Sequence, residues 1–212
     1  MSTQTSMLRK TNIAVCISGG GRSLTNLLDY QKNANWEVAA IVSSSTSCAG
    51  NSIAEKHKIP LLIGDFKQKD IEGTTQLVSS LEAFLKENQI EWIVLAGFLK
   101  LFPALRDFNQ RVINIHPALL PKFGGKGMYG KNVHEAVIAA KEQETGATVH
   151  FVNGRYDEGA LISQIKVAVE SSDTPESVAA KVFAAECLLL PKTLDKLIHG
   201  LLPNSQKSVE QF

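Results

Sequence analysis

Short apolar runs that alternate with segments of helical periodicity constrain the fold of this chain more than any other feature. The first run covers residues 13–17, glycines fill positions 19–21, and leucines follow at positions 24, 27 and 28. Such runs are typical of parallel strands buried on both faces, and leucines at this spacing form one side of a helix. The same alternation predicts strands at 38–42, 61–63, 92–95 and 112–115, and helices at 52–57 and 74–88.

This order of elements predicts an α/β fold, a doubly wound, mostly parallel Rossmann-like sheet with right-handed crossovers. The second half of the chain follows a different pattern. Residues 147–152 and 160–169 have strand character with a turn between them, which predicts a C-terminal antiparallel hairpin. Thr174 is expected to cap a final helix with Pro175 in its first turn, and Pro191 to kink or break that helix.

Length and composition favour one domain. The chain has 212 residues, of which 44% are hydrophobic, and this is enough for a single well-buried core. No repeat or linker interrupts the pattern. We therefore expect one domain at 12–202, a flexible extension at 1–11 and a flexible tail at 203–212.

The distribution of charge and cysteine argues against several classes of partner. The net charge is +1, with 22 basic and 21 acidic side chains, so nucleic-acid binding is a poor expectation. Cys16, Cys48 and Cys187 lack paired spacing, which favours reduced thiols in a cytoplasmic protein over disulfides or a zinc site. No apolar stretch approaches the roughly 20 residues of a membrane helix, and we expect no membrane partner and no metal.

The glycines at 19–21, followed by Arg22 and Ser23, join the first strand to the first helix. Glycine lets the backbone approach an anion, and free amides at a helix start favour negative charge. A Walker loop would need Lys-Ser/Thr after the last glycine, and a dinucleotide fingerprint would need glycine or alanine at Leu24. The loop therefore predicts a site for one phosphate, with Ser23 as helix cap, or else a tight turn without a ligand.

Asn114 and His116 stand at the end of a predicted strand, where open α/β sheets bind ligands. In an extended chain the two side chains point to the same side, and both can donate to a developing oxyanion. A buried structural histidine is the alternative. Asp157 lies in a predicted turn 41 residues after His116, and spacing alone does not show that it reaches the histidine.

Other polar residues near these motifs offer weaker signals. Thr148 and His150 alternate with apolar residues on one strand, so they line the same cleft or form a polar edge face. The glycine-rich loop at 124–130 is expected to be a mobile lid near the site. His57, His134 and His199 are expected on helix surfaces and receive no role.

Four motifs together resemble the folate-dependent phosphoribosylglycinamide formyltransferase family over nearly the whole chain, from about residue 13 to 200. They are Ile-Ser-Gly-Gly-Gly at 17–21, Leu-Ala-Gly-Phe at 95–98, Asn-Ile-His-Pro-Ala-Leu-Leu-Pro at 114–121 and Gly-Ala-Thr-Val-His-Phe-Val at 146–152. The third motif is highly specific to folate-dependent formyl transferases, and the glycine loop narrows the choice among them.

The resemblance implies a role for individual residues. Asn114, His116 and Asp157 match the catalytic residues of the family. The ribotide phosphate and ribose site falls on Gly21, Arg22, Ser23 and Glu186. The folate site falls on Leu99, Lys100, Leu101, Phe102, Asn114, Val152 and Tyr156.

The chain departs from the family pattern at three places. Tyr156 and Glu158 replace the usual neighbours of the catalytic aspartate, and Arg22 stands where serine is often found. Some members use an arginine for the folate glutamate tail, and Lys67 or Lys69 is the candidate here.

The activity implied by the resemblance is transfer of the formyl group of 10-formyltetrahydrofolate, the co-substrate, to the amine of 5'-phosphoribosylglycinamide in purine biosynthesis. Asp157 is expected to raise the pKa of His116. The expected partners are these small molecules alone, for a monomer or homodimer.

Three alternatives stay open. A formyltetrahydrofolate deformylase would be expected to carry an extra domain before the first strand, and a methionyl-tRNA formyltransferase an extra one after the last helix. The third alternative is a non-catalytic phosphate-binding module of Rossmann type.

Overall fold

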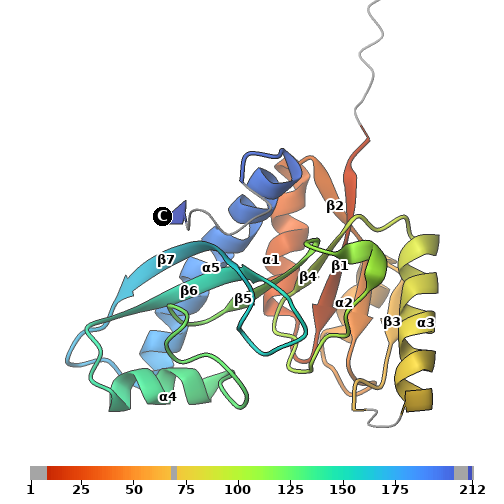
Figure 1. Cartoon of the computed structure of the whole chain (residues 1–212). Coiled ribbons are helices and arrows are strands. Elements are labelled where there is room, and N and C mark those ends of the chain that lie inside the picture. Colours follow the sequence, from red (N-terminus) through yellow and green to blue (C-terminus); the bar gives the residue numbers. More distant parts are fainter. Residues whose placement is uncertain (1–8, 68–70, 203–209, 212) are drawn as a thin grey trace, which may run out of the picture.

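A single mixed sheet forms the centre of the computed structural model, which describes residues 9–67, 71–202 and 210–211 (Figure 1). The strand order is β3-β2-β1-β4-β5-β6-β7-β8. Pairing is parallel from β3 through to β5 and antiparallel between β5, β6 and β7. The strands are β1 (Thr11–Ile17), β2 (Trp36–Ser43), β3 (Leu61–Ile63), β4 (Trp92–Leu95), β5 (Val112–His116), β6 (Glu144–Phe151), β7 (Leu161–Ala168) and β8 (Glu210–Gln211).

The expected doubly wound, mostly parallel sheet and the C-terminal hairpin are both confirmed. β8 comes from the predicted tail and pairs in parallel with β7. The rest of that tail, residues 203–209 and 212, lies outside the described residues, as do residues 1–8 of the predicted extension and Lys69.

Two helical layers explain why the strand runs are apolar throughout. Ile13, Val15 and Ile17 of β1 lie in the core cluster that contains the buried leucines of α1 and α5. Ala14 and Cys16, which point the other way, lie in the cluster that contains the α3 leucines. The helices are α1 (Arg22–Tyr30), α2 (Asn51–His57), α3 (Ile71–Glu87), α4 (Lys131–Ala139) and α5 (Pro175–Ile198), with short 3-10 turns at Gln31–Asn33 and Arg106–Phe108.

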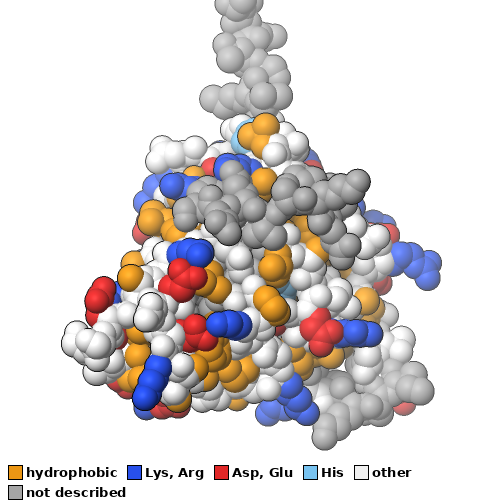
Figure 2. All heavy atoms as spheres, turned by 60° about the vertical axis from the view of Figure 1, so that its left-hand side comes forward, with side chains coloured by type: hydrophobic (Ala, Val, Ile, Leu, Met, Phe, Trp, Pro, Cys, Tyr) orange, Lys and Arg blue, Asp and Glu red, His pale blue; other side chains and the backbone are white. Residues whose placement is uncertain are grey.

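None of the described helices is long and apolar enough to cross a bilayer. On the face shown in Figure 2, basic and acidic side chains are interspersed among the described residues, without a dominant patch of one sign.

The final helix begins as predicted and continues further than predicted. Thr174 accepts a hydrogen bond from the Ser177 amide in a reciprocal cap, and Pro175 follows it. The expected break at Pro191 is wrong, because α5 continues through this proline to Ile198. A proline leaves the carbonyl four residues earlier without its helical donor. That carbonyl belongs to Cys187, and Asn26 Nδ2 of α1 donates to it at 3.0 Å.

Because Asn26 donates to the carbonyl that Pro191 leaves without a helical donor, the two residues should be energetically coupled. Asn26→Ala should lower the free energy of unfolding by about 1–2 kcal/mol, because a half-buried carbonyl loses its donor. In a Pro191→Ala background the new amide at position 191 reaches the same carbonyl, so the cost of Asn26→Ala should fall. Urea unfolding of the four proteins measures this coupling.

The control is Asn12→Ala, which removes a similar bond to the carbonyl of Asn88 on another element. Its cost should be the same with and without Pro191. If Asn26→Ala lowered the free energy of unfolding equally in the two backgrounds, Asn26 would not be replacing the amide that Pro191 lacks.

Candidate active site

A cavity of about 720 Å³ opens at the carboxyl ends of β1, β4 and β5. This volume lies in the range of natural small-molecule sites. Arg22 and Ser23 line it after β1, and residues 97–99 after β4. The last residues of β5, the loop at 125–131 and one side of α5 complete the wall. The cavity is therefore where an open α/β sheet is expected to bind its ligand.

The structure brings the three predicted catalytic residues together. Asn114 and His116 alternate on β5 and both line the cavity. Asp157 also lines it, with Oδ2 3.4 Å from His116 Nδ1 and Oδ1 3.4 Å from Asn114 Nδ2. The contact between His116 and Asp157, which spacing alone left open, is present.

A tight turn between β6 and β7 positions Asp157. Asn153 Nδ2 donates to the carbonyl of Glu158, and Asn153 Oδ1 accepts from the amide of Arg155. At Gly159 a Cβ atom would collide with the carbonyl of Phe151, so glycine is required there. Asp157 itself has a φ of 55°, a left-handed conformation that costs a non-glycine residue roughly 1 kcal/mol or more.

The hydrogen bonds of His116 define its tautomer. Its Nε2 lies 2.7 Å from the carbonyl oxygen of Phe123, which can only accept, so Nε2 carries the proton. In the neutral ring the lone pair of Nδ1 then faces the carboxylate of Asp157. A proton on Nδ1 would turn this contact into a charge-assisted hydrogen bond.

Asp157 raises the pKa of His116, as expected, but the net shift is downward. Burial lowers the pKa of this imidazole and outweighs the Asp157 carboxylate and the Phe123 carbonyl, which both raise it. The sequence showed the favourable neighbour but not the depth of burial, since His116 is only 3% exposed.

Asp157 is a buried carboxylate with several partners. Burial alone would raise its pKa, but His150, His116 and the amide of Gly125 together hold that pKa below its usual range. The Gly125 amide donates to Oδ2 at 3.0 Å. The segment at 123–130 thus contacts both residues of the pair: the Phe123 carbonyl lies against His116, and the Gly125 amide donates to Asp157.

His150 has a role that the sequence did not identify. Its Nδ1 lies 2.8 Å from the carbonyl of Phe151, so Nε2 is the acceptor in the neutral ring. Asn114 Nδ2 lies 3.0 Å from that Nε2. Asn114 and His150 face each other across the β5–β6 ladder. His150 therefore orients the amide of Asn114.

Thr148 neither lines the cavity nor lies on an exposed edge face, so neither alternative from the sequence holds for it. Its hydroxyl is fully buried, donates to the carbonyl of Ala118 and accepts from the amide of Leu120 and from Gln164. Thr148 therefore fixes the segment that follows β5, and it has no hydrogen left for a ligand.

His134 was expected on a helix surface, yet it is 5% exposed and lines the cavity. Its Nδ1 is buried without a hydrogen-bond partner among the described residues. Burial and the neighbouring His116 lower the pKa of this ring. The available signal was its i, i+3 spacing to Val137, which is buried on the same side of α4.

The glycine loop meets both α1 and α2. Gly21, not Ser23, is the N-cap of α1, with a φ of 74°, so the expected cap by Ser23 is wrong. A Cβ on Gly21 would lie 2.6 Å from Ile53 Cδ1, so this glycine also permits the close approach of α2. Ser23, the second residue of the helix, lines the cavity.

Arg22 and Glu186 lie on opposite helices at this end of the cavity. The Arg22 guanidinium lies 3.7 Å from the centre of the Phe183 ring. Burial raises the pKa of Glu186 to about 7, against a smaller opposing effect of Arg22.

The residues predicted to bind folate are divided between several environments. Leu99 and Tyr156 line the main cavity. Phe102 is buried in the core, with its ring 6.0 Å from that of Phe98, and its side chain does not line the cavity. The side chain of Leu101 is 45% exposed, and the amide of Val152 donates to the carbonyl of Val112.

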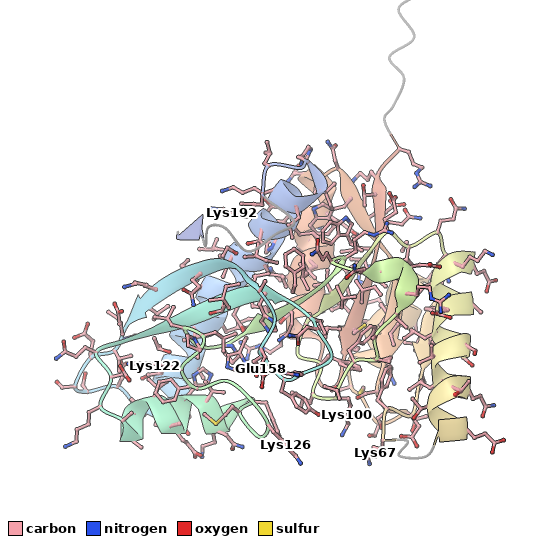
Figure 3. All side chains as sticks on the ribbon, in the orientation of Figure 1. Lys67, Lys100, Lys122, Lys126, Glu158 and Lys192 are labelled. Atoms are coloured by element: carbon pink, nitrogen blue, oxygen red, sulfur yellow. The ribbon has the colours of Figure 1, made fainter. Side chains whose placement is uncertain are left out.

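Lys100 lines a second cavity of about 530 Å³ that shares Leu99 with the first. Lys67, one of the two candidates for the folate glutamate tail, lines it as well. Figure 3 shows both lysines extending toward the same lower edge of the view.

Within the described residues, no group of three or more His, Cys, Asp or Glu side chains is arranged to hold a metal ion. The three cysteines are all free, and Cys16 and Cys48 are buried.

Comparison with known proteins gives consistent matches. Residues 11–194 match the profile of the formyl transferase family. The chloroplastic phosphoribosylglycinamide formyltransferase of Arabidopsis thaliana is 37% identical over 183 residues, which are 84% of this chain and 62% of that protein. The chain thus spans less than two thirds of this relative's length.

Solved structures agree in fold. A phosphoribosylglycinamide formyltransferase from Coxiella burnetii superposes with a TM-score of 0.81 and 30% identity, over 96% of this chain and 99% of that one. A formyltetrahydrofolate deformylase from Pseudomonas syringae pv. tomato gives 0.76 at 23% identity, over 90% and 62%. The second match shows the shared fold alone.

The buried histidines predict a loss of stability in mild acid. The pKa values of His116 and His134 are lower in the folded protein than the ordinary 6.5, so the unfolded chain binds more protons below that pH. The free energy of unfolding should therefore fall as pH decreases from 6.5 to 5.5, by at most about 1.4 kcal/mol per pH unit for each histidine.

His134→Gln should make this decline shallower, as measured by urea unfolding between pH 7.5 and 5.5. His57→Gln is the control, because His57 is exposed on α2 and should leave the slope as it is. A slope for His134→Gln equal to that of the wild type would show that His134 titrates alike in both states.

Proposed function

The chain belongs to the formyl transferase family, and we propose that it transfers the formyl group of 10-formyltetrahydrofolate to the amine of 5'-phosphoribosylglycinamide. The observation that carries this proposal is the contact of Asp157 with both Asn114 and His116 inside a cavity. The cavity also has an arginine and a glycine-loop helix start, groups that suit a phosphate. The products are formylglycinamide ribotide and tetrahydrofolate, within purine biosynthesis.

Chemistry in this site needs no covalent bond to the protein. The ribotide amine attacks the formyl carbon, its carbonyl oxygen becomes an oxyanion, and the carbon–N10 bond then breaks. The amine loses a proton, and N10 of the folate gains one. With the phosphate held by Gly21, Arg22 and Ser23 and the ribose by Glu186, remote binding energy orients the amine.

Asn114 and His116 are the proposed donors to the oxyanion. Each such donor is typically worth about 3 kcal/mol of barrier. Asn114 already directs one hydrogen at His150 and the other, over 3.4 Å, at Asp157. The second bond is long and is the one that a substrate oxygen would replace. For His116 to donate through Nε2, the carbonyl of Phe123 must first move away.

The pair of His116 and Asp157 suits the proton transfer. The neutral imidazole has its free lone pair on Nδ1, 3.4 Å from the carboxylate. It can take up the proton that the amine releases, with Asp157 stabilising the imidazolium, and that proton then passes to N10 through the pair or a water molecule.

Folate is proposed to occupy the part of the cavity beside Leu99 and Tyr156. Lys67 and Lys100 at the second cavity are the proposed contacts of its glutamate tail. Leu101, Phe102 and Val152 are proposed to contribute backbone groups, and Asn114 its side-chain amide.

We further infer that the protein acts in the cytoplasm on small molecules alone, as a monomer or homodimer. Three free cysteines support a reducing compartment.

One assay tests the function and its alternatives. The wild type should release tetrahydrofolate from 10-formyltetrahydrofolate only when the ribotide is present. His116→Ala and Asp157→Asn should each reduce kcat by at least about 100-fold, because each removes a group that acts in the transition state. His57→Ala, on the surface of α2, should retain activity.

Release without the ribotide would indicate a deformylase. If tetrahydrofolate were released in neither mixture, the result would favour a non-catalytic phosphate-binding module. Near-wild-type turnover in both active-site variants would contradict the assigned chemistry even if transfer occurs.

A substitution at Gly20 tests the phosphate loop more cleanly than one at Gly21. A Cβ at Gly20 meets nothing within 4 Å, whereas one at Gly21 would collide with Ile53. Gly20→Val should therefore leave the melting temperature nearly unchanged. It should raise the KM for the ribotide about tenfold, because it keeps the phosphate away from the backbone. An unchanged KM would remove this loop from the site.

A further inference from the structure

Arg22 packs against the ring of Phe183 at the wall of the cavity. It is the first residue of α1, and its guanidinium lies 3.7 Å from the centre of the Phe183 ring on α5. Both residues line the cavity. At this distance the planar group rests on the face of the ring, where the cation is attracted by the π electrons.

The charge of Arg22 is available to a ligand. Within the described part of the chain its side chain makes no ion pair or hydrogen bond, and the acidic group on which it acts electrostatically is Glu186, one helical turn from Phe183. Burial raises the pKa of Glu186 to about 7, so near neutral pH this carboxyl is protonated much of the time. A protonated carboxyl does not neutralise the guanidinium, and it can exchange hydrogen bonds with a hydroxyl.

We propose that Phe183 is a positioning residue that holds Arg22 flat against α5, so that the N–H edge of the guanidinium receives the phosphate of the ribotide in a bidentate contact. This inference rests on the proposed function and adds a residue that determines specificity for a phosphorylated amine. The central carbon of the guanidinium lies over the ring, and both residues line the cavity into which the N–H edge is proposed to point.

The arrangement explains why arginine suits this position. A planar guanidinium matches two phosphate oxygens, and prior stacking reduces the freedom that the side chain loses on binding. A lysine would keep the charge but would neither stack as a plane nor bind in a fork. Leucine at 183 would keep an apolar contact but would lose the flat platform.

The experiment compares Arg22→Lys, Phe183→Leu and Phe183→Tyr in the full chain. Arg22→Lys should raise the KM for the ribotide about tenfold and Phe183→Leu about fivefold, each with kcat within about threefold of wild type. Phe183→Tyr, which keeps the ring, should stay close to wild type. The KM for 10-formyltetrahydrofolate should not change in any variant.

A second substrate separates phosphate recognition from general packing. Glycinamide riboside, which lacks the phosphate, should be used poorly but with equal kcat/KM by the wild type, Arg22→Lys and Phe183→Leu. The matched control is Arg111→Lys, because Arg111 also lies over a phenylalanine, Phe108 at 5.8 Å, away from the cavity. Arg111→Lys should leave the kcat/KM for both the ribotide and the riboside unchanged.

Calorimetric titration with ribose 5-phosphate makes failure of this inference distinguishable from failure of the proposed function. If the wild type transfers formyl groups but Phe183→Leu leaves the ribotide KM unchanged, the positioning role is overturned and the function stands. If the wild type transfers nothing, yet binds ribose 5-phosphate more tightly than Arg22→Lys and Phe183→Leu do, the function falls and the positioning role stands. Absence of both transfer and binding overturns both.

Discussion

The carboxylate of Asp157 is the charge around which the polar interior of this protein is arranged. A buried carboxylate is costly unless several donors stabilise it. Here the donors are Asn114 Nδ2 from β5 and the amide of Gly125 from the loop that follows β5. The imidazoles of His116 and His150 lie 3.4 and 3.5 Å from the carboxylate oxygens and would add charge-assisted bonds when protonated. The left-handed backbone at Asp157 is a further cost that the turn before β7 must sustain. The antiparallel register of β5 and β6, which sets Asn114 opposite His150, is therefore part of the site.

This network means that the site exchanges hydrogen bonds when it binds a ligand. Both hydrogens of the Asn114 amide have acceptors, and the Nε2–H of His116 donates a hydrogen bond to the carbonyl of Phe123. A substrate oxygen therefore competes with groups of the protein, and the net gain is the difference between the two bonds. Because Phe123 and Gly125 belong to one loop, moving the carbonyl from His116 also disturbs the amide that stabilises Asp157.

The sequence predicted most of the architecture because its apolar runs have the strand and helix periods that burial requires. It also predicted which end of the sheet bears the main cavity, since Asn114 and His116 stand at the end of a strand. It failed where a tertiary contact overrides a local rule. Pro191 does not end its helix, because Asn26 from α1 supplies a donor to the freed carbonyl. Thr148, His134 and the net pKa of His116 depend on burial by distant segments, which residue spacing along one strand or helix does not report.

The lowered pKa of His116 fits the proposed chemistry better than a net rise would. A histidine that was already an imidazolium beside Asp157 would have no lone pair for the proton of an attacking amine. Burial keeps the ring neutral before the reaction, while the carboxylate 3.4 Å from Nδ1 favours the charged ring once that proton arrives. At the other end of the cavity, burial likewise favours the neutral form of Glu186 by raising its pKa. A protonated carboxyl leaves the charge of Arg22 free for an anion. In the proposed function, desolvation thus prepares both ends of the cavity, with a base at one end and an unneutralised cation at the other.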